Sequence, residues 1–156
     1  MILLDVSTCL VGFWAGHVHH EATRAWLDAA DNDSLALCRV AQLGWLRHLT
    51  NPAVLGVDAL TRIEAWNFIA SVLQDARFHW VVEGGDVDDH FVHFVGADRS
   101  HKLWTDDYLA ALASSGRHSL ATLDQKLARR YPDLDVINPL AVAVDPDDGE
   151  SQNAGA

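Results

Sequence analysis

Cysteine, basic residues and long apolar runs are all scarce in this chain of 156 residues. Its two cysteines, Cys9 and Cys38, stand among apolar residues, and two are too few for the disulfide framework of a small secreted domain. No apolar run approaches the roughly 20 residues that span a bilayer. The first apolar run follows no basic segment and is interrupted by Asp5, unlike a secretory signal peptide. We therefore expect a cytoplasmic protein with no membrane association.

Positive charge is the second shortage. Eleven Lys and Arg residues face 22 Asp and Glu residues, which gives a formal net charge of -11. This balance argues against a protein that holds nucleic acid only by neutralising its phosphates. It does not exclude a nuclease whose metal ions supply the positive charge. Residues 141–156 contribute four acidic residues and no basic ones, so we expect one domain over 1–140 and a disordered acidic tail over 141–156.

Short apolar runs alternate with segments of helical spacing along the rest of the chain. The runs predict strands over 1–4, 35–38, 78–82, 119–123 and 135–138. The intervening periodicity predicts helices over 18–30, 40–49, 58–75, 86–95, 106–113 and 125–130. Continuous apolar strands separated by helices are typical of a parallel sheet buried on both faces. The sequence therefore predicts an α/β fold.

Acidic residues follow two of these strands. Asp5 closes the first, and Asp124 follows the fourth. Carboxyl ends of parallel strands meet at one edge of a sheet, where such folds bind their ligands. Asp106, in the first turn of a helix that we expect Thr105 to cap, would approach the same edge, as would Gln42 in the helix after the second strand. At about 4–5 Å two carboxylates repel by roughly 3–4 kcal/mol at an effective dielectric near 20, so a cation is needed. All-oxygen ligands favour Mg²⁺ or Mn²⁺.

Each of these residues also has an ordinary structural explanation. Acids such as Asp106 are favoured in the first turn of a helix by the helix dipole, and Asp124 is a suitable cap for a following helix. The tract of His17, His19 and His20 is either a metal-binding cluster or a solvated helix end. Only the joint position of the three aspartates at one sheet edge favours the metal site.

Several segments together resemble one protein family. LLDVSTCL at the start, AQLGWLRHLTNPAV, TDDYLAALASSG, LATLD and a late NPL are similar in order and spacing to PIN-domain ribonucleases, in particular the VapC-type toxins of bacterial toxin–antitoxin pairs. The similarity covers most of 1–140. It implies a three-layer α/β/α sandwich with a central parallel sheet, Mg²⁺ or Mn²⁺, cleavage of RNA, a cognate antitoxin protein and a homodimer.

The same resemblance assigns roles to individual residues. The acidic residues of the family fall on Asp5, Asp106 and Asp124, which would be the metal ligands and catalytic residues. A glutamate of the family falls on Gln42, which keeps an acceptor oxygen but lacks the charge, and Asp107 is a candidate substitute. Ser7 replaces an asparagine and can still hydrogen-bond a carboxylate or water. Together with Arg47, it is a candidate substrate-binding residue.

Three hypotheses follow. The first is a Mg²⁺-dependent endoribonuclease, the toxin of a type II toxin–antitoxin system. The second is a weakened PIN-like domain that binds RNA or a protein partner without cleavage, because Gln42 replaces an acid. The third, a receiver-like or phosphatase-like domain built on Asp5, is the least favoured, since no second acid accompanies Asp5.

Overall fold

The computed structural model describes residues 1–141, so nearly all of the predicted acidic tail lies outside the described residues. Five parallel strands form one sheet in the order β3-β2-β1-β4-β5. They are β1 (Ile2–Leu4), β2 (Leu35–Leu37), β3 (Phe78–Trp80), β4 (Ser119–Ala121) and β5 (Val136–Ile137). The predicted strands are all present, each shorter than expected. The N-terminal strand therefore lies at the centre of the sheet.

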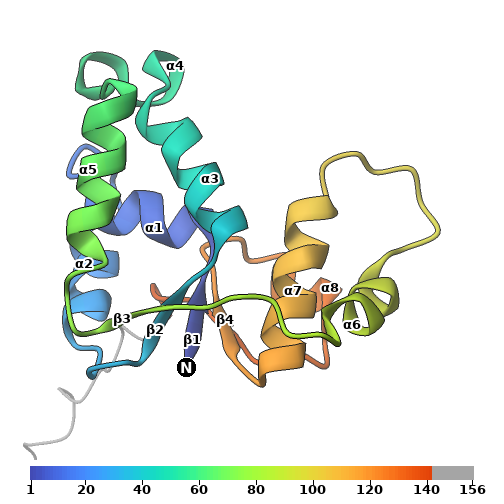
Figure 1. Ribbon diagram of the computed structural model, residues 1–156. Helices are drawn as coiled ribbons and strands as arrows, with labels where there is room; N and C mark the ends of the chain where they lie inside the picture. The colour runs from blue at the N-terminus through green and yellow to red at the C-terminus, as the bar shows by residue number, and fades with distance from the viewer. Residues whose placement is uncertain (142–156) are drawn as a thin grey trace, which may run out of the picture.

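Helices cover both faces of this sheet (Figure 1). One layer contains α1 (Val6–Phe13), α2 (His20–Asp28), α3 (Arg39–Leu49) and α5 (Arg62–Val72). The other contains α6 (Val87–Phe94), α7 (Trp104–Gly116) and α8 (Leu127–Arg130). The short helices α4 (Pro52–Leu55) and η1 (Gly56–Asp58) connect α3 to α5. This confirms the predicted three-layer α/β/α sandwich. Within residues 1–141, no helix combines the length and apolar character that crossing a membrane requires.

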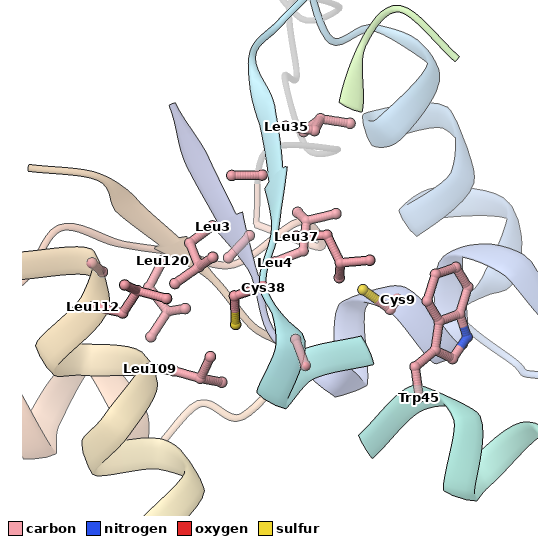
Figure 2. Close-up of a cluster of buried hydrophobic side chains, with 14 of the residues drawn as sticks. Leu3, Leu4, Cys9, Leu35, Leu37, Cys38, Trp45, Leu109, Leu112 and Leu120 are labelled. Atoms are coloured by element: carbon pink, nitrogen blue, oxygen red, sulfur yellow. The ribbon is translucent and has the colours of Figure 1, made fainter. Parts of the chain in front are cut away.

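The core forms where the central strands meet the two layers. Leu3 and Leu4 are wholly buried, and Figure 2 shows them between side chains of α7 and the pair Cys9 and Trp45. Both cysteines are free and buried, and burial is the main reason that the pKa of each thiol is raised. They therefore act as small apolar core residues, as expected.

Helix α1 was not anticipated from the sequence. Its first residues are Val, Ser and Thr, types that favour strands or caps over helix interiors. The structure starts a helix there because the Asp5 carboxylate accepts the backbone N–H of Val6. The turn from β1 into α1 is thus made by the acidic residue that the sequence marked as functional.

The predicted helix starts differ from the observed ones by one to four residues, and two of the differences concern caps. The helix expected over 58–75 begins at Arg62, because Thr61 and Glu64 form a reciprocal capping box there. Thr105 does not cap α7, which begins at Trp104, two residues before the expected start at Asp106, and has no side-chain cap.

Two buried threonines allow a matched test of the core. Thr8 and Thr23 are both fully buried in helices, yet Thr8 Oγ1 donates to the Ala121 carbonyl at 3.0 Å whereas Thr23 Oγ1 has no partner. We expect Thr23→Val to raise the free energy of unfolding by about 1 kcal/mol, because an unpaired buried hydroxyl becomes a methyl group. Thr8→Val should lower it by about 1 kcal/mol. Urea unfolding of both variants measures the difference, and a loss of stability in Thr23→Val would contradict the first expectation.

Candidate active site at the carboxyl edge of the sheet

The site lies where the strand order reverses. After β1 the chain builds β2 and β3 on one side, and it later returns to place β4 on the other side of β1. In open α/β sheets the crevice at such a switch point, beyond the carboxyl ends of the strands, is the usual ligand site. A cavity of about 780 Å³ occupies this position, and Asp5, Asp106 and Asp124 all line it. The three aspartates singled out in the sequence are therefore brought together.

The Asp5 carboxylate accepts hydrogen bonds from two hydroxyl groups, one just after β1 and one just after β4. Its Oδ2 accepts hydrogen bonds from Ser7 Oγ at 2.8 Å and from Thr122 Oγ1 at 2.8 Å. Ser7 Oγ in turn accepts the backbone N–H of Leu123 at 3.1 Å. Two hydroxyls thus link the segment after β1 to the segment after β4 and fix the orientation of the Asp5 carboxylate. Thr122, which had no assigned role, is buried at the centre of this network.

Asp124 lies on a loop three residues beyond β4, not at the strand end that the sequence predicted. Its backbone N–H donates to Thr122 Oγ1 at 3.1 Å, and its Oδ1 accepts the backbone N–H of Lys126 at 2.9 Å. These contacts hold a turn that keeps the exposed Asp124 at the edge of the cavity.

The two neighbouring acids at the start of α7 point to different places. Asp106 lines the cavity, and its Oδ2 accepts a hydrogen bond from Arg130 Nη1 at 3.2 Å. Asp107 is buried and accepts the hydroxyl of Tyr131, next to a separate cavity of about 300 Å³. Adjacent helical residues project about 100° apart, so α7 can present only one of them to the carboxyl edge. Asp107 does not line the cavity of the three aspartates and is not placed to substitute for a missing acid there.

The pKa of Asp106 reflects its burial and the negative charge of the cavity. Its pKa is raised from 3.8 to about 6, first by burial and next by the negative charge of Asp5, with Asp124 adding to the effect. The positive charge of Arg130 opposes this rise. The cavity therefore has an excess of negative charge that a bound cation would relieve.

Gln42 lies elsewhere. It is buried, and its Oε1 accepts a hydrogen bond from Arg39, whose guanidinium lies 4.7 Å from the ring centroid of Trp80. It is absent from the residues that line the cavity. The structure thus connects Gln42 through Arg39 to Trp80 of β3 and not to the lining of the cavity.

The opposite wall of the cavity comes from α3 and the loop before α2. Arg47 and His48 line it from α3, and Asn51 lines it from the start of α4, so Arg47 lies where the sequence suggested. Gly44 also lines it, and a Cβ added there would lie 2.5 Å from Val6 Cγ2. Close packing of α1 against α3 therefore depends on the missing side chain at Gly44.

The side chains at the cavity offer the type of ligand atom that a hard divalent cation prefers. The carboxylates of Asp5, Asp106 and Asp124 and the nearby hydroxyls supply oxygen only, the ligands that Mg²⁺ and Mn²⁺ prefer. Over residues 1–141, however, no three His, Cys, Asp or Glu side chains are grouped so that they could hold a metal ion as they stand. Asp106 pairs with Arg130, and Asp124 accepts a backbone N–H. Metal binding would therefore require these side chains to rearrange.

Known proteins give an independent comparison. Ribonuclease VapC41 of Mycobacterium tuberculosis is 39% identical over 132 residues, which span 80% of this chain and 89% of VapC41. Ribonuclease VapC29 of the same organism is 33% identical over 147 residues, which span 88% of this chain and 96% of VapC29. No family model matches the chain.

Solved structures share the fold. FitAcB of Neisseria gonorrhoeae aligns with a TM-score of 0.58 at 22% identity, covering 89% of this chain and 98% of that chain. VapC20 of M. tuberculosis, a toxin that cleaves the sarcin–ricin loop, aligns with a TM-score of 0.59 at 14% identity, covering 83% and 94%. Together with the two VapC ribonucleases, these matches confirm the resemblance seen in the sequence. The chain belongs to the VapC family of PIN-domain proteins.

Proposed function

We propose that this protein is a metal-dependent endoribonuclease and the toxin of a type II toxin–antitoxin system. The observation that carries the proposal is the cavity at the switch point of the sheet, where Asp5, Asp106 and Asp124 converge. Burial there, together with the charges of Asp5 and Asp124, raises the pKa of Asp106. The relatives named as VapC ribonucleases support the same activity. Residues 1–140 would form the nuclease domain, and the acidic segment from 141 onward would lie outside it.

Asp5, Asp106 and Asp124 would hold Mg²⁺ or Mn²⁺. Such an ion supplies Lewis-acid stabilisation of the charge that develops during hydrolysis of a phosphodiester. The chain's own residues prepare this site. Ser7 and Thr122 orient the Asp5 carboxylate, and Arg130 balances the charge of Asp106 in the absence of the ion. Arg47, exposed on the opposite wall, would contact a phosphate of the RNA.

The partners follow from the same proposal. The chain would act on RNA in the cytoplasm, form a homodimer and be bound by a cognate antitoxin. Support for an antitoxin comes from the fold shared with FitAB, one structure of which is bound to an IR36 DNA fragment and aligns with a TM-score of 0.64.

Cleavage of total RNA by the purified protein tests the proposal. We expect fragments in the presence of Mg²⁺ or Mn²⁺ and none when a chelator is added. The alternative is a weakened domain, suggested by a neutral glutamine at position 42. RNA bound in a gel-shift assay but left intact with either metal would overturn the nuclease and establish that alternative.

Position 42 gives a specific prediction. Because Gln42 is buried against Arg39 and does not line the cavity, we expect Gln42→Glu to change the rate of RNA cleavage by less than about tenfold, the lower limit of indirect effects on a metal site. Initial rates at saturating Mg²⁺ measure the effect. A gain of a hundredfold or more would show that position 42 acts directly at the metal.

A further inference from the structure

The loop between α1 and α2 brings three aromatic rings into a row beside the acidic cavity. The ring centroids of Trp14 and His17 are 6.0 Å apart, and those of His17 and His19 are 5.6 Å apart. His17 and His19 line the same cavity as Asp5, Asp106 and Asp124. Two residues of the histidine tract, His17 and His19, thus belong to the lining of this cavity, whereas the His20 ring bonds the Val11 carbonyl oxygen instead.

This ring row is held in place by its own hydrogen bonds. The indole Nε1 of Trp14 donates to Asp58 Oδ2 at 3.2 Å, which ties the row to η1. The backbone N–H of His19 donates to His17 Nδ1 at 3.1 Å. A Cβ at Gly16 would lie 2.8 Å from Trp14 Nε1, so the loop backbone passes directly against the indole. The position of the rings therefore follows from the folded loop.

The hydrogen bond to His17 also fixes its chemistry. Because Nδ1 accepts the His19 N–H, the ring proton of the neutral imidazole is on Nε2. That nitrogen is a donor, suited to a phosphate oxygen or a base acceptor. His19 is exposed, and in the part of the chain that the structure describes the three aspartates are the only acids that line the cavity. The ring row therefore offers ring faces and a hydrogen-bond donor, while the carboxylate of Asp58 that it contacts is already bonded to the Trp14 indole and does not line the cavity.

We propose that Trp14, His17 and His19 form a base-binding subsite, on which an unpaired RNA base next to the cleaved phosphate stacks. This inference rests on the proposed function and adds where the substrate lies. Every base has a face that stacks on an aromatic ring, and recognition of RNA by stacking requires bases that are free of a duplex. An acidic protein with few cations gains affinity for RNA from such contacts without relying on phosphate neutralisation.

Fluorescence anisotropy with a labelled single-stranded RNA oligonucleotide, measured with chelator so that no cleavage occurs, tests the subsite. We expect the double variant His17→Ala, His19→Ala to weaken binding by about 5- to 150-fold, the range for loss of one stacked base. His17→Phe should retain most of the affinity, because phenylalanine keeps an aromatic face for the base to stack on. His101→Ala, an exposed histidine outside the cavity, is the matched control and should bind as the parent does.

Kinetics with Mg²⁺ separate this proposal from the nuclease itself. If the parent cleaves RNA, the double variant should show a raised KM and a kcat within about twofold of the parent. Cleavage by the parent with unchanged Kd and KM in the double variant would overturn the subsite and leave the nuclease intact. If the parent does not cleave, the proposed nuclease fails, and the anisotropy still decides the subsite. Equal loss of affinity for a blunt RNA duplex would also overturn it.

Discussion

Asp5→Asn should reduce RNA cleavage by about 100- to 1000-fold while the protein stays folded. The substitution removes a full negative charge from the cavity, and loss of one such electrostatic group typically costs this much in rate. It is nearly isosteric, and asparagine caps helices as well as aspartate does, so α1 keeps its start. The variant therefore separates the charge of Asp5 from its structural role.

Initial cleavage rates with Mg²⁺, together with urea unfolding, measure both effects. Asp31→Asn is a matched control, because it removes the same charge from an exposed loop away from the cavity. It should cleave within about twofold of the parent. Retention of parental activity by a folded Asp5→Asn protein would remove Asp5 from the catalytic site and with it the assignment of the cavity.

Asp106→Asn should have opposite effects on activity and stability. The pKa of Asp106 is about 6 in the folded protein against 3.8 when exposed, so folding favours its protonated form. The resulting contribution to stability is complete below pH 3.8 and is lost as the pH rises through about 6. At neutral pH the ionised carboxylate therefore opposes folding. Asparagine removes that cost, although it also weakens the pairing with Arg130.

We expect Asp106→Asn to raise the free energy of unfolding at pH 7.5 by on the order of 1 kcal/mol and to leave it little changed near pH 3.5. Cleavage should fall by about 100-fold or more, as for Asp5→Asn. Mg²⁺ should stabilise the parent and have little effect on the variant. Asp107→Asn is the control. It should lose stability because Asp107 accepts the Tyr131 hydroxyl in the core, and should keep most of its cleavage rate. Lower stability of Asp106→Asn at both pH values would contradict the electrostatic explanation.

The strand-end pattern was sufficient to place Asp5 and Asp124 at one edge of the sheet. A short apolar run closed by Asp5, and a second run followed by Asp124, predict one sheet edge, because parallel strands end together. The structure brings both residues to one cavity even though the strand before Asp124 is shorter than expected. The error in strand length is harmless, since the turn held by Thr122 returns Asp124 to the edge.

Other features depend on tertiary contacts that no local pattern contains. Helix α1 begins with β-branched and hydroxylated residues, and only the carboxylate of Asp5 at its start explains it. The choice between Asp106 and Asp107 depends on the rotation of α7, which Tyr131 fixes from 24 residues away. The ring row likewise depends on a contact between Trp14 and Asp58, 44 residues apart. A tract of histidines in the sequence does not show that it faces a cavity.

The central position of β1 determines how late in translation the site around Asp5 can form. Asp5 is among the first residues to be synthesised, yet its partner Thr122 lies 117 residues later, and β4 must pair directly with β1. At roughly 5–20 residues per second, a ribosome needs about 6–23 seconds to add that stretch. Throughout this interval Asp5 has neither Thr122 nor Asp124 beside it. A nascent chain of this topology cannot cut the messenger RNA from which it is translated until nearly the whole domain has been made.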